Sequence, residues 1–236
     1  MNDNAIVRFE DVVKVYGQGE GQQTAVDHVS FTIDRGEFAV ILGQSGAGKS
    51  TVLNMLGGMD RPTSGKITVN GRELSGLSDR ELSKYRADTI GFIFQFYNLL
   101  PTLTAYEIVA LTADILPGAL DAGEMLKKVG LYGHRGKFPS QMSGGEQQRV
   151  SIARALAKHP PILLGDEPTG ALDSETGLLV LQLLVDICRE KNSTVIIVTH
   201  NSDIARCADK VIRMRSGKIR EVKINSDPIP VQDIVW

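Results

Sequence analysis

The sequence predicts an α/β fold in which helices flank a parallel sheet, with an antiparallel β subdomain at the N-terminus and an inserted helical subdomain. Three continuously apolar runs indicate the parallel sheet, because strands that are covered on both faces lack polar alternation. These runs are Phe38–Leu42, Ile162–Leu164 and Thr194–Val198. Short β-branched runs near the N-terminus indicate the antiparallel strands, and helical periodicity between Pro101 and Pro161 indicates the inserted helices.

The antiparallel strands are expected where β-branched residues alternate with polar ones between Gly or Asp residues. The expected strands are Ile6–Phe9, Val12–Tyr16, Val29–Ile33 and Lys66–Asn70. The dipeptide Asn70-Gly71 follows the last of them and is a strong hairpin signal, because both central positions of such a turn need positive φ. A second hairpin is expected around Ser216-Gly217, close to the C-terminus.

Helices are expected where apolar residues recur at intervals of three and four. The expected helices are Ser50–Leu56, Leu103–Leu116, Asp121–Val129, Glu146–Lys158 and Ser174–Lys191. Pro228 and Pro230 predict a loose C-terminal end.

All 236 residues are expected to form a single domain, since this length and a 42% hydrophobic content suffice for a sizeable core. Within residues 1–236, a catalytic core is expected to comprise residues 5–100 and 160–221. Residues 101–159 are the expected helical subdomain, and residues 222–236 are the expected tail.

Charge and hydropathy argue against several kinds of partner. The net charge is −2 and the basic residues are scattered, so no nucleic-acid partner is expected. No run approaches the roughly 18 apolar residues of a membrane span, and the first ten residues do not resemble a secretory signal. The chain is therefore expected in the cytosol, where a partner can still attach it to a membrane. Cys188 and Cys207 form no CxxC pair and are expected to be buried free thiols.

The segment from Gly43 to Ser50 fits the pattern GxxxxGK[ST] and lies between an apolar strand and a helix. Its glycines let backbone N–H groups converge on phosphate oxygens, and the following helix presents its positive end. Lys49 is expected to neutralise the β- and γ-phosphates, and the hydroxyl of Ser50 to ligate Mg²⁺. The segment therefore predicts a nucleoside triphosphate site.

Two acids follow the apolar run Ile162–Leu164. Asp166 is expected to hold Mg²⁺ through water, and Glu167 to act as the general base on the attacking water. Alone, two solvated acids at the end of a strand would be the simpler interpretation. The phosphate loop makes the catalytic interpretation the better one.

Ser143-Gly-Gly-Glu146 has two interpretations. It fits a capping box, with Ser143 as N-cap and Glu146 reaching back to it, which needs no function. Two glycines at the start of a helix also leave N–H groups open to an anion.

This segment, continued by Gln147, resembles the signature of the ATP-binding-cassette (ABC) ATPases, and the resemblance covers about residues 5 to 221. It implies that Tyr16 matches the aromatic that stacks on adenine. Gln95 matches a glutamine that touches Mg²⁺ and reports to a membrane partner. Residues 171–173 match the loop that follows the second nucleotide motif, and His200 matches the histidine that contacts the γ-phosphate. The resemblance also implies that the fold is a P-loop NTPase core with a helical signature subdomain.

The resemblance implies the following sets of residues. The nucleotide-binding residues are Tyr16, Gly43, Gln44, Ser45, Gly46, Ala47, Gly48, Lys49, Ser50, Thr51, Ser143, Gly144, Gly145 and Glu146. The catalytic residues are Glu167, His200, Lys49 and Gln95. The metal ligands are Ser50, Gln95 and Asp166.

The implied function is an ATPase that uses ATP and Mg²⁺ and pairs head to tail with a second copy of itself, each signature closing over the other's nucleotide. The pair would drive a membrane permease that has an extracytoplasmic domain, at the cytoplasmic face of the membrane. The runs 91–101 and 166–173 resemble a bacterial branch that includes lipoprotein-release, macrolide-export and antimicrobial-peptide-resistance systems. In this family the signature usually has Leu and Gln where Met142 and Glu146 stand, and Ser is frequent at the position of Gly170.

Three alternatives remain open at this point. The first is a soluble ABC ATPase of DNA repair or of ribosomes, although the chain lacks sustained heptads and a second cassette. The second is another P-loop enzyme, such as a small-molecule kinase, which would not need the signature or His200. The third is an ATPase that regulates cell-wall hydrolases through a membrane partner.

Overall fold

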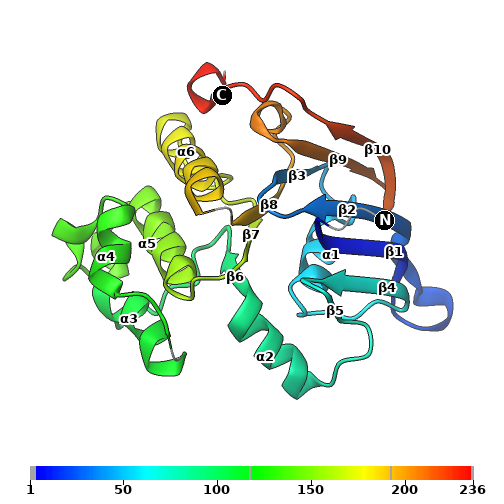
Figure 1. The fold of residues 1–236 in the computed structure, drawn as a ribbon, viewed down its shortest axis with the longest axis horizontal. Helices are drawn as coiled ribbons and strands as arrows, with labels where there is room; N and C mark the ends of the chain where they lie inside the picture. The colour runs from blue at the N-terminus through cyan, green and yellow to red at the C-terminus, as the bar shows by residue number, and fades with distance from the viewer. Residues whose placement is uncertain (1–3, 117, 192, 235–236) are drawn as a thin grey trace.

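A mixed sheet runs through the described part of the chain, which comprises residues 4–116, 118–191 and 193–234 of this computed structural model (Figure 1). Its strands are β3 (Phe38–Leu42), β6 (Ile90–Ile93), β7 (Ile162–Asp166), β8 (Thr194–Thr199), β9 (Lys210–Arg215) and β10 (Lys218–Ile224). They lie in the order β10-β9-β3-β8-β7-β6. All neighbours are parallel except β9 and β10, which form the predicted hairpin around Ser216-Gly217. The expected parallel sheet is confirmed.

A second, antiparallel sheet is built from the N-terminal segments. Its strands are β1 (Ala5–Tyr16), β2 (Gln23–Asp34), β4 (Ser64–Val69) and β5 (Arg72–Glu73), in the order β2-β1-β4-β5. The prediction of two separate strands between Ile6 and Tyr16 was wrong: β1 is continuous, and a register shift between Phe9 and Val12 absorbs Asp11 at a φ of 51°. Asn70 and Gly71 form the predicted turn, both with positive φ.

The helices are α1 (Lys49–Leu56), α2 (Asp79–Thr89), α3 (Ala105–Ile115), α4 (Ala122–Lys128), α5 (Gly144–Ala157) and α6 (Ser174–Lys191). Short 3-10 turns are Gly19–Gly21, Tyr132–His134, Pro139–Gln141, Ile204–Cys207 and Val231–Asp233.

The sequence interpretation missed α2 and β6. In α2 the buried residues are Leu82 and Tyr85, which is too few to give a helical period, although Ser78 and Glu81 form a capping box at its start. In β6 the short apolar run is interrupted by Gly91, where a side chain would meet Leu163 of β7.

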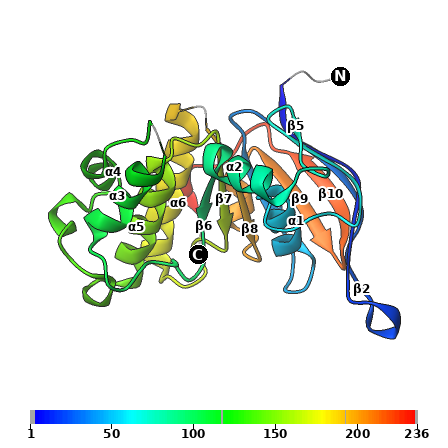
Figure 2. The ribbon, with the colours of Figure 1, turned by 90° about the horizontal axis from the view of Figure 1, so that it is seen from below.

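The central sheet divides the apolar interior into two cores. Along β3, Phe38, Val40 and Leu42 belong to a core with α3 to α6, whereas Ala39 and Ile41 belong to a core with α1 and the antiparallel sheet. Both faces are therefore covered, which explains why β3 shows no polar alternation. Helices α3, α4 and α5 pack on one another beyond β6 (Figures 1 and 2). The boundaries 101 and 159 of the proposed helical subdomain stay a prediction.

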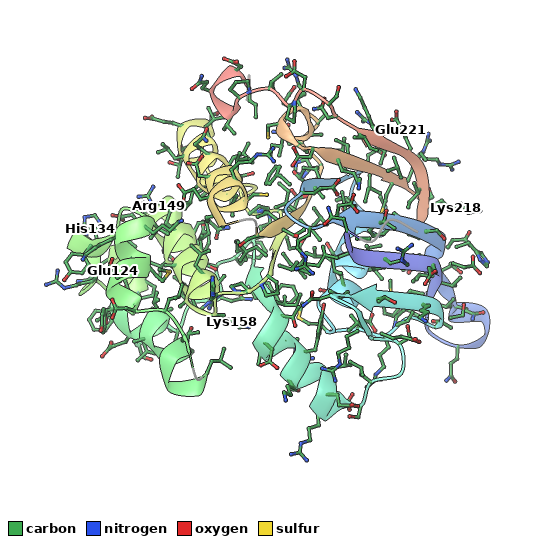
Figure 3. All side chains as sticks on the ribbon, in the orientation of Figure 1. Glu124, His134, Arg149, Lys158, Lys218 and Glu221 are labelled. Atoms are coloured by element: carbon green, nitrogen blue, oxygen red, sulfur yellow. The ribbon has the colours of Figure 1, made fainter. Side chains whose placement is uncertain are left out.

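Lys158 joins the end of α5 to the junction between α2 and β6 (Figure 3). Its ammonium group donates to the carbonyl of Arg86 at 2.8 Å and to that of Ile90 at 2.7 Å. Burial, together with the positive charges of the neighbouring Arg154 and Arg86, lowers the pKa of Lys158 to about 8. The cation stabilises the carbonyl end of α2 and fixes the edge strand β6 relative to the helices.

The tail is not loose over its described part, so that prediction was wrong. Val231 and Ile234 are buried in the core that includes α6, and the amide of Ile229 donates to the carbonyl of Arg206 at 3.1 Å. Pro230 precedes the 3-10 turn Val231–Asp233, where its fixed φ suits a tight turn. Residues 235 and 236 lie outside the described residues.

Within the described ranges, no helix has the length and apolar character needed to cross a bilayer.

Both cysteines are buried free thiols, as expected. Burial raises the pKa of Cys188 to about 11 and that of Cys207 to about 12. The thiolate is the reactive form, so we predict negligible labelling of the folded protein by a disulfide reagent at pH 8. Unfolding in guanidinium should expose both thiols, and Cys188→Ala should halve that count. Rapid labelling of the native protein would contradict this prediction.

Candidate nucleotide-binding site

A cavity of about 850 Å³ lies at the carboxyl ends of β3, β6, β7 and β8. In an open α/β sheet this edge is where ligands bind. The predicted site residues that line it are Tyr16, Ser45, Gly46, Ala47, Gly48, Lys49, Ser50, Thr51, Gln95, Asp166, Glu167 and His200. The structure therefore brings together side chains that are up to 184 positions apart in the sequence, from Tyr16 to His200.

The loop between β3 and α1 curls around one end of this cavity. Gly46 and Gly48 have φ values of 77° and 95°, and a side chain at position 48 would come 2.4 Å from the carbonyl oxygen of Ala25. Gly48 is also the N-cap of α1. The loop therefore needs glycine, and it places the positive end of α1 at the cavity, which is an anion site.

Lys49 lies inside the loop and is only 7% exposed. Its ammonium group donates to the carbonyl of Gly43 at 2.8 Å and to that of Gln44 at 3.1 Å. Gly43 and Gln44 do not line the cavity themselves, so their place in the site is to hold Lys49. An ammonium group has three donors, and one more can serve an anion in the cavity.

Ser50 and Asp166 lie side by side at the floor of the cavity. The hydroxyl of Ser50 donates to a carboxylate oxygen of Asp166 at 3.2 Å. Burial raises the pKa of Asp166, and the negative charge of Glu167 contributes to the rise. A bound cation would offset this cost, and a hydroxyl with a carboxylate is the hard-oxygen donor set that Mg²⁺ prefers. The residues present therefore fit the implied metal.

Glu167 and His200 face each other at the ends of β7 and β8. The Nδ1 atom of His200 lies 3.0 Å from Oε1 of Glu167. Glu167 has a φ of 45°, a costly backbone conformation for this residue, and its amide donates to the carbonyl of Val198 at 3.0 Å. Gln95 lines the same cavity, and a side chain at Gly170 would come 3.3 Å from its Nε2 atom and 3.4 Å from Cβ of Glu167. The cavity thus joins an acid, an imidazole and an amide at the ends of β7, β8 and β6.

The four signature residues lie outside this cavity. They begin α5, where the hydroxyl of Ser143 accepts from the amide of Glu146 at 3.2 Å and Glu146 accepts from the amide of Ser143 at 2.7 Å. The capping box is confirmed. The glycines also have a packing reason: a side chain at Gly144 would meet the Tyr97 hydroxyl, and one at Gly145 would meet Thr176 of α6.

The carboxylate of Glu146 is neutralised within its own surroundings. The hydrogen bond from the Ser143 amide holds its pKa low, with further contributions from Lys137 and His134. His134 Nδ1 lies 2.5 Å from Oε1 of Glu146 (Figure 3 labels His134). The His134 side chain is 42% exposed and joins the start of α5 through this contact. The carboxylate of Glu146 is thus engaged in the cap of α5.

The sequence interpretation missed one wall of the cavity. This wall is lined by Gln23, Thr24, Ala25, Ser216 and Gly217. The amide of Gly217 donates to the carbonyl of Ala47 at 3.1 Å, and the carbonyl of Gly217 accepts from Asp27 at 2.9 Å. The Ser216-Gly217 hairpin was visible in the sequence, but its position beside the phosphate loop depends on long-range strand pairing.

Comparisons with known proteins agree with this geometry. A model of the ABC transporter family matches residues 26–170. The chain is 41% identical, over 93% of its length and 90% of the relative's, to an uncharacterised ABC transporter ATP-binding protein of Mycobacterium tuberculosis. It is 42% identical to the lipoprotein-releasing system ATP-binding protein LolD of Xanthomonas campestris, over 92% and 93% of the two chains.

A solved structure is similar over the same extent. It is the post-hydrolysis dimer, bound to ADP and Pi, of the ATP-binding cassette MJ0796, a protein of Methanocaldococcus jannaschii. The TM-score is 0.85 at 42% identity, and the match covers 92% of this chain and 98% of that one. With the phosphate loop, the acids and the signature in place, the chain belongs to the ABC transporter family, as an ATP-binding and ATP-hydrolysing cassette subunit.

Proposed function

We propose that this chain binds ATP with Mg²⁺ in the cavity and hydrolyses it when a second copy closes over the nucleotide, and that the closing motion drives a membrane permease. One observation carries the proposal. The cavity assembles the phosphate loop, Gln95, Asp166, Glu167 and His200, whereas Ser143 to Glu146 lie outside it on another part of the same chain.

The loop and α1 supply the binding of the triphosphate. Backbone N–H groups of the loop and the start of α1 face the β- and γ-phosphates, and Lys49 neutralises their charge. Tyr16 offers its ring to the adenine at the other end of the cavity. Ser50 and Asp166 would hold Mg²⁺ together with Gln95, and the cation would supply charge neutralisation between the β- and γ-phosphates.

Glu167 accepts the proton of the attacking water, whose oxygen forms the new bond to the γ-phosphorus while the bond to ADP breaks. His200 lies within hydrogen-bond distance of Glu167, from where it orients the carboxylate and reaches toward the γ-phosphate. The constrained backbone at Glu167 and the contact with His200 position the carboxylate before the substrate arrives. The base is therefore preorganised.

A second copy completes the site. The start of α5 presents Ser143 and the amides of Gly144 and Gly145, which the capping box does not use. Two chains packed head to tail would place each α5 over the other's γ-phosphate. MJ0796 is described as a dimer in two solved structures. Because the γ-phosphate touches both copies, its release removes the contact and opens the pair.

The permease contact is proposed on the segment after Gln95. Phe96 is 76% exposed and Leu100 is 53% exposed, and exposed apolar side chains that lie close together are typical of a protein contact site. The relative LolD is named for a lipoprotein-releasing system. We place this chain in that branch, at the cytoplasmic face of the membrane, with a permease that has an extracytoplasmic domain.

Replacing Lys49 with Ala tests the nucleotide site. The change removes a buried charge-assisted contact, so the affinity for ATP should fall about 10- to 100-fold. Titration of the purified protein with a fluorescent ATP analogue measures the effect. The exposed Lys84→Ala variant is the matched control and should bind like wild type. Equal affinity in Lys49→Ala would refute the proposed phosphate site.

A further inference from the structure

We infer that Asp60 and Lys14 are positioning residues that fix the Tyr16 ring for the adenine base. The inference rests on the proposed ATP site. It adds two residues that no sequence pattern connects to that site, one on β1 and one on the segment after α1.

Asp60 and Lys14, which we call the clamp, contact each other and the Tyr16 side chain. The hydroxyl of Tyr16 donates to Oδ2 of Asp60 at 2.5 Å. Lys14 Nζ contacts the other oxygen of Asp60, Oδ1, at 2.5 Å and stands 4.7 Å from the centre of the Tyr16 ring. Lys14 also donates to the carbonyl of Arg61 at 2.8 Å, and Asp60 accepts from the amide of Arg61 at 2.7 Å. The clamp therefore holds the ring at its tip and at one face.

The clamp acts through Tyr16 and not on the ligand. Tyr16 lines the nucleotide cavity, whereas Lys14 and Asp60 are not among the residues that line it. Tyr16 is 42% exposed, so packing restrains only part of its ring and the contacts with Asp60 and Lys14 add to that restraint. The ammonium group of Lys14 occupies one face of the ring through a cation–π contact. A base would stack on the opposite face.

The pKa shifts of Asp60 and Tyr16 favour the hydrogen bond between them. Burial of Asp60 acts to raise its pKa, but the hydrogen bonds from Lys14 and Tyr16 outweigh this and lower the pKa. Burial and the Asp60 carboxylate both raise the pKa of Tyr16, so its hydroxyl keeps the proton that it donates. The side chains of Lys14 and Asp60 are 13% and 24% exposed, so water screens the pair less than it screens a surface ion pair.

The clamp also relates the two ends of the nucleotide site. Asp60 follows α1 by four positions, and α1 begins at the phosphate loop. Tyr16 ends β1, a strand of the other sheet. The Tyr16–Asp60 hydrogen bond thus links the base platform to the segment that follows α1. A fixed platform binds a base at a lower entropic cost.

The experiment compares two ligands of the full-length protein. Asp60→Ala should weaken the binding of ATP about 2- to 10-fold, the range of an aromatic stacking contact. The binding of inorganic tripolyphosphate, which has no base, should stay unchanged. Tyr16→Phe, which removes the hydroxyl that Asp60 and Thr51 contact, should show the same split between the two ligands. In steady-state hydrolysis, both variants should raise the KM for ATP and leave kcat unchanged. Asp79→Ala, an exposed carboxylate nearby that pairs with Arg61, is the matched control.

A double-mutant cycle separates positioning from a general structural role. In a Tyr16→Ala background, Asp60→Ala should have no further effect on ATP affinity, because Asp60 then has no ring to hold. Equal loss of ATP and tripolyphosphate binding, or full additivity in the cycle, would overturn the inference. Unchanged ATP affinity in both Asp60→Ala and Tyr16→Phe would overturn it as well. If wild type bound neither ligand, the proposed ATP site itself would be wrong, which is a separate result.

Discussion

Glu167→Gln is expected to slow steady-state ATP hydrolysis about 1,000-fold, within the range that a general base contributes, and to leave ATP affinity near that of wild type. Glutamine has the size of glutamate and can keep the hydrogen bond to His200, which lies 3.0 Å away. It cannot accept a proton from water. The loss therefore falls on the chemical step, and binding through the loop and Lys49 remains.

The same variant should also accumulate as an ATP-bound dimer. With hydrolysis blocked, the γ-phosphate stays in place and continues to join the two copies, so the closed state gains population. Phosphate release measures the rate, and light scattering with and without ATP measures the association. Glu175→Gln, an exposed acid in the first turn of α6, is the matched control and should behave like wild type.

Two outcomes would contradict this assignment in different ways. Hydrolysis at the wild-type rate would show that Glu167 is not the base. Slow hydrolysis by a protein that stays monomeric with ATP, even beside its membrane partner, would leave the base in place but contradict the sandwich of two copies.

The sequence predicted the parts of the fold whose signal is local. The β3, β7 and β8 runs are apolar throughout because both faces of the sheet are covered, and this pattern can be recognised without knowing the partners. Helix α2 could not be found in this way, because its polar surface hides the period and Leu82 and Tyr85 alone face the core. The capping box at Ser78 and Glu81 was the available signal, and a cap without an apolar stripe is weak evidence.

In the site, too, residues with a local sequence signal were predicted and contacts that depend on the folded chain were not. The phosphate loop and the two acids at the end of β7 carry local patterns, whereas His200 was identified through the resemblance to the ABC family. Strand order brings all of them to one edge of the sheet. The clamp on Tyr16 and the contact between His134 and Glu146 carry none, because each joins residues whose proximity depends on the folded chain. The proline-containing tail was misread for a related reason. Prolines indicate that a helix or strand ends, but not whether the segment packs, and here Val231 and Ile234 are buried.

Ser143→Asp is expected to abolish ATP-driven dimerisation and to lower hydrolysis roughly 100-fold, since like charges in an interface cost several kcal/mol. Asp is as good an N-cap as Ser, so α5 and its capping box should persist and the protein should keep its fold. The new carboxylate would face the partner's γ-phosphate. Because position 143 lies outside the chain's own cavity, ATP binding to the monomer should be unaffected.

Ser143→Asn is the matched control, because asparagine has the shape and the capping ability of aspartate without its charge. This variant should retain far more activity than Ser143→Asp. The decisive measurement mixes two impaired proteins, Lys49→Ala and Ser143→Asp. In a mixed pair, one site receives both defects and the other receives an intact Lys49 from one copy and an intact Ser143 from its partner. Equal random mixing should therefore restore up to about a quarter of the composite sites. A mixture no more active than the mean of its components would show that each chain completes its own site, and the head-to-tail pair would have to be abandoned.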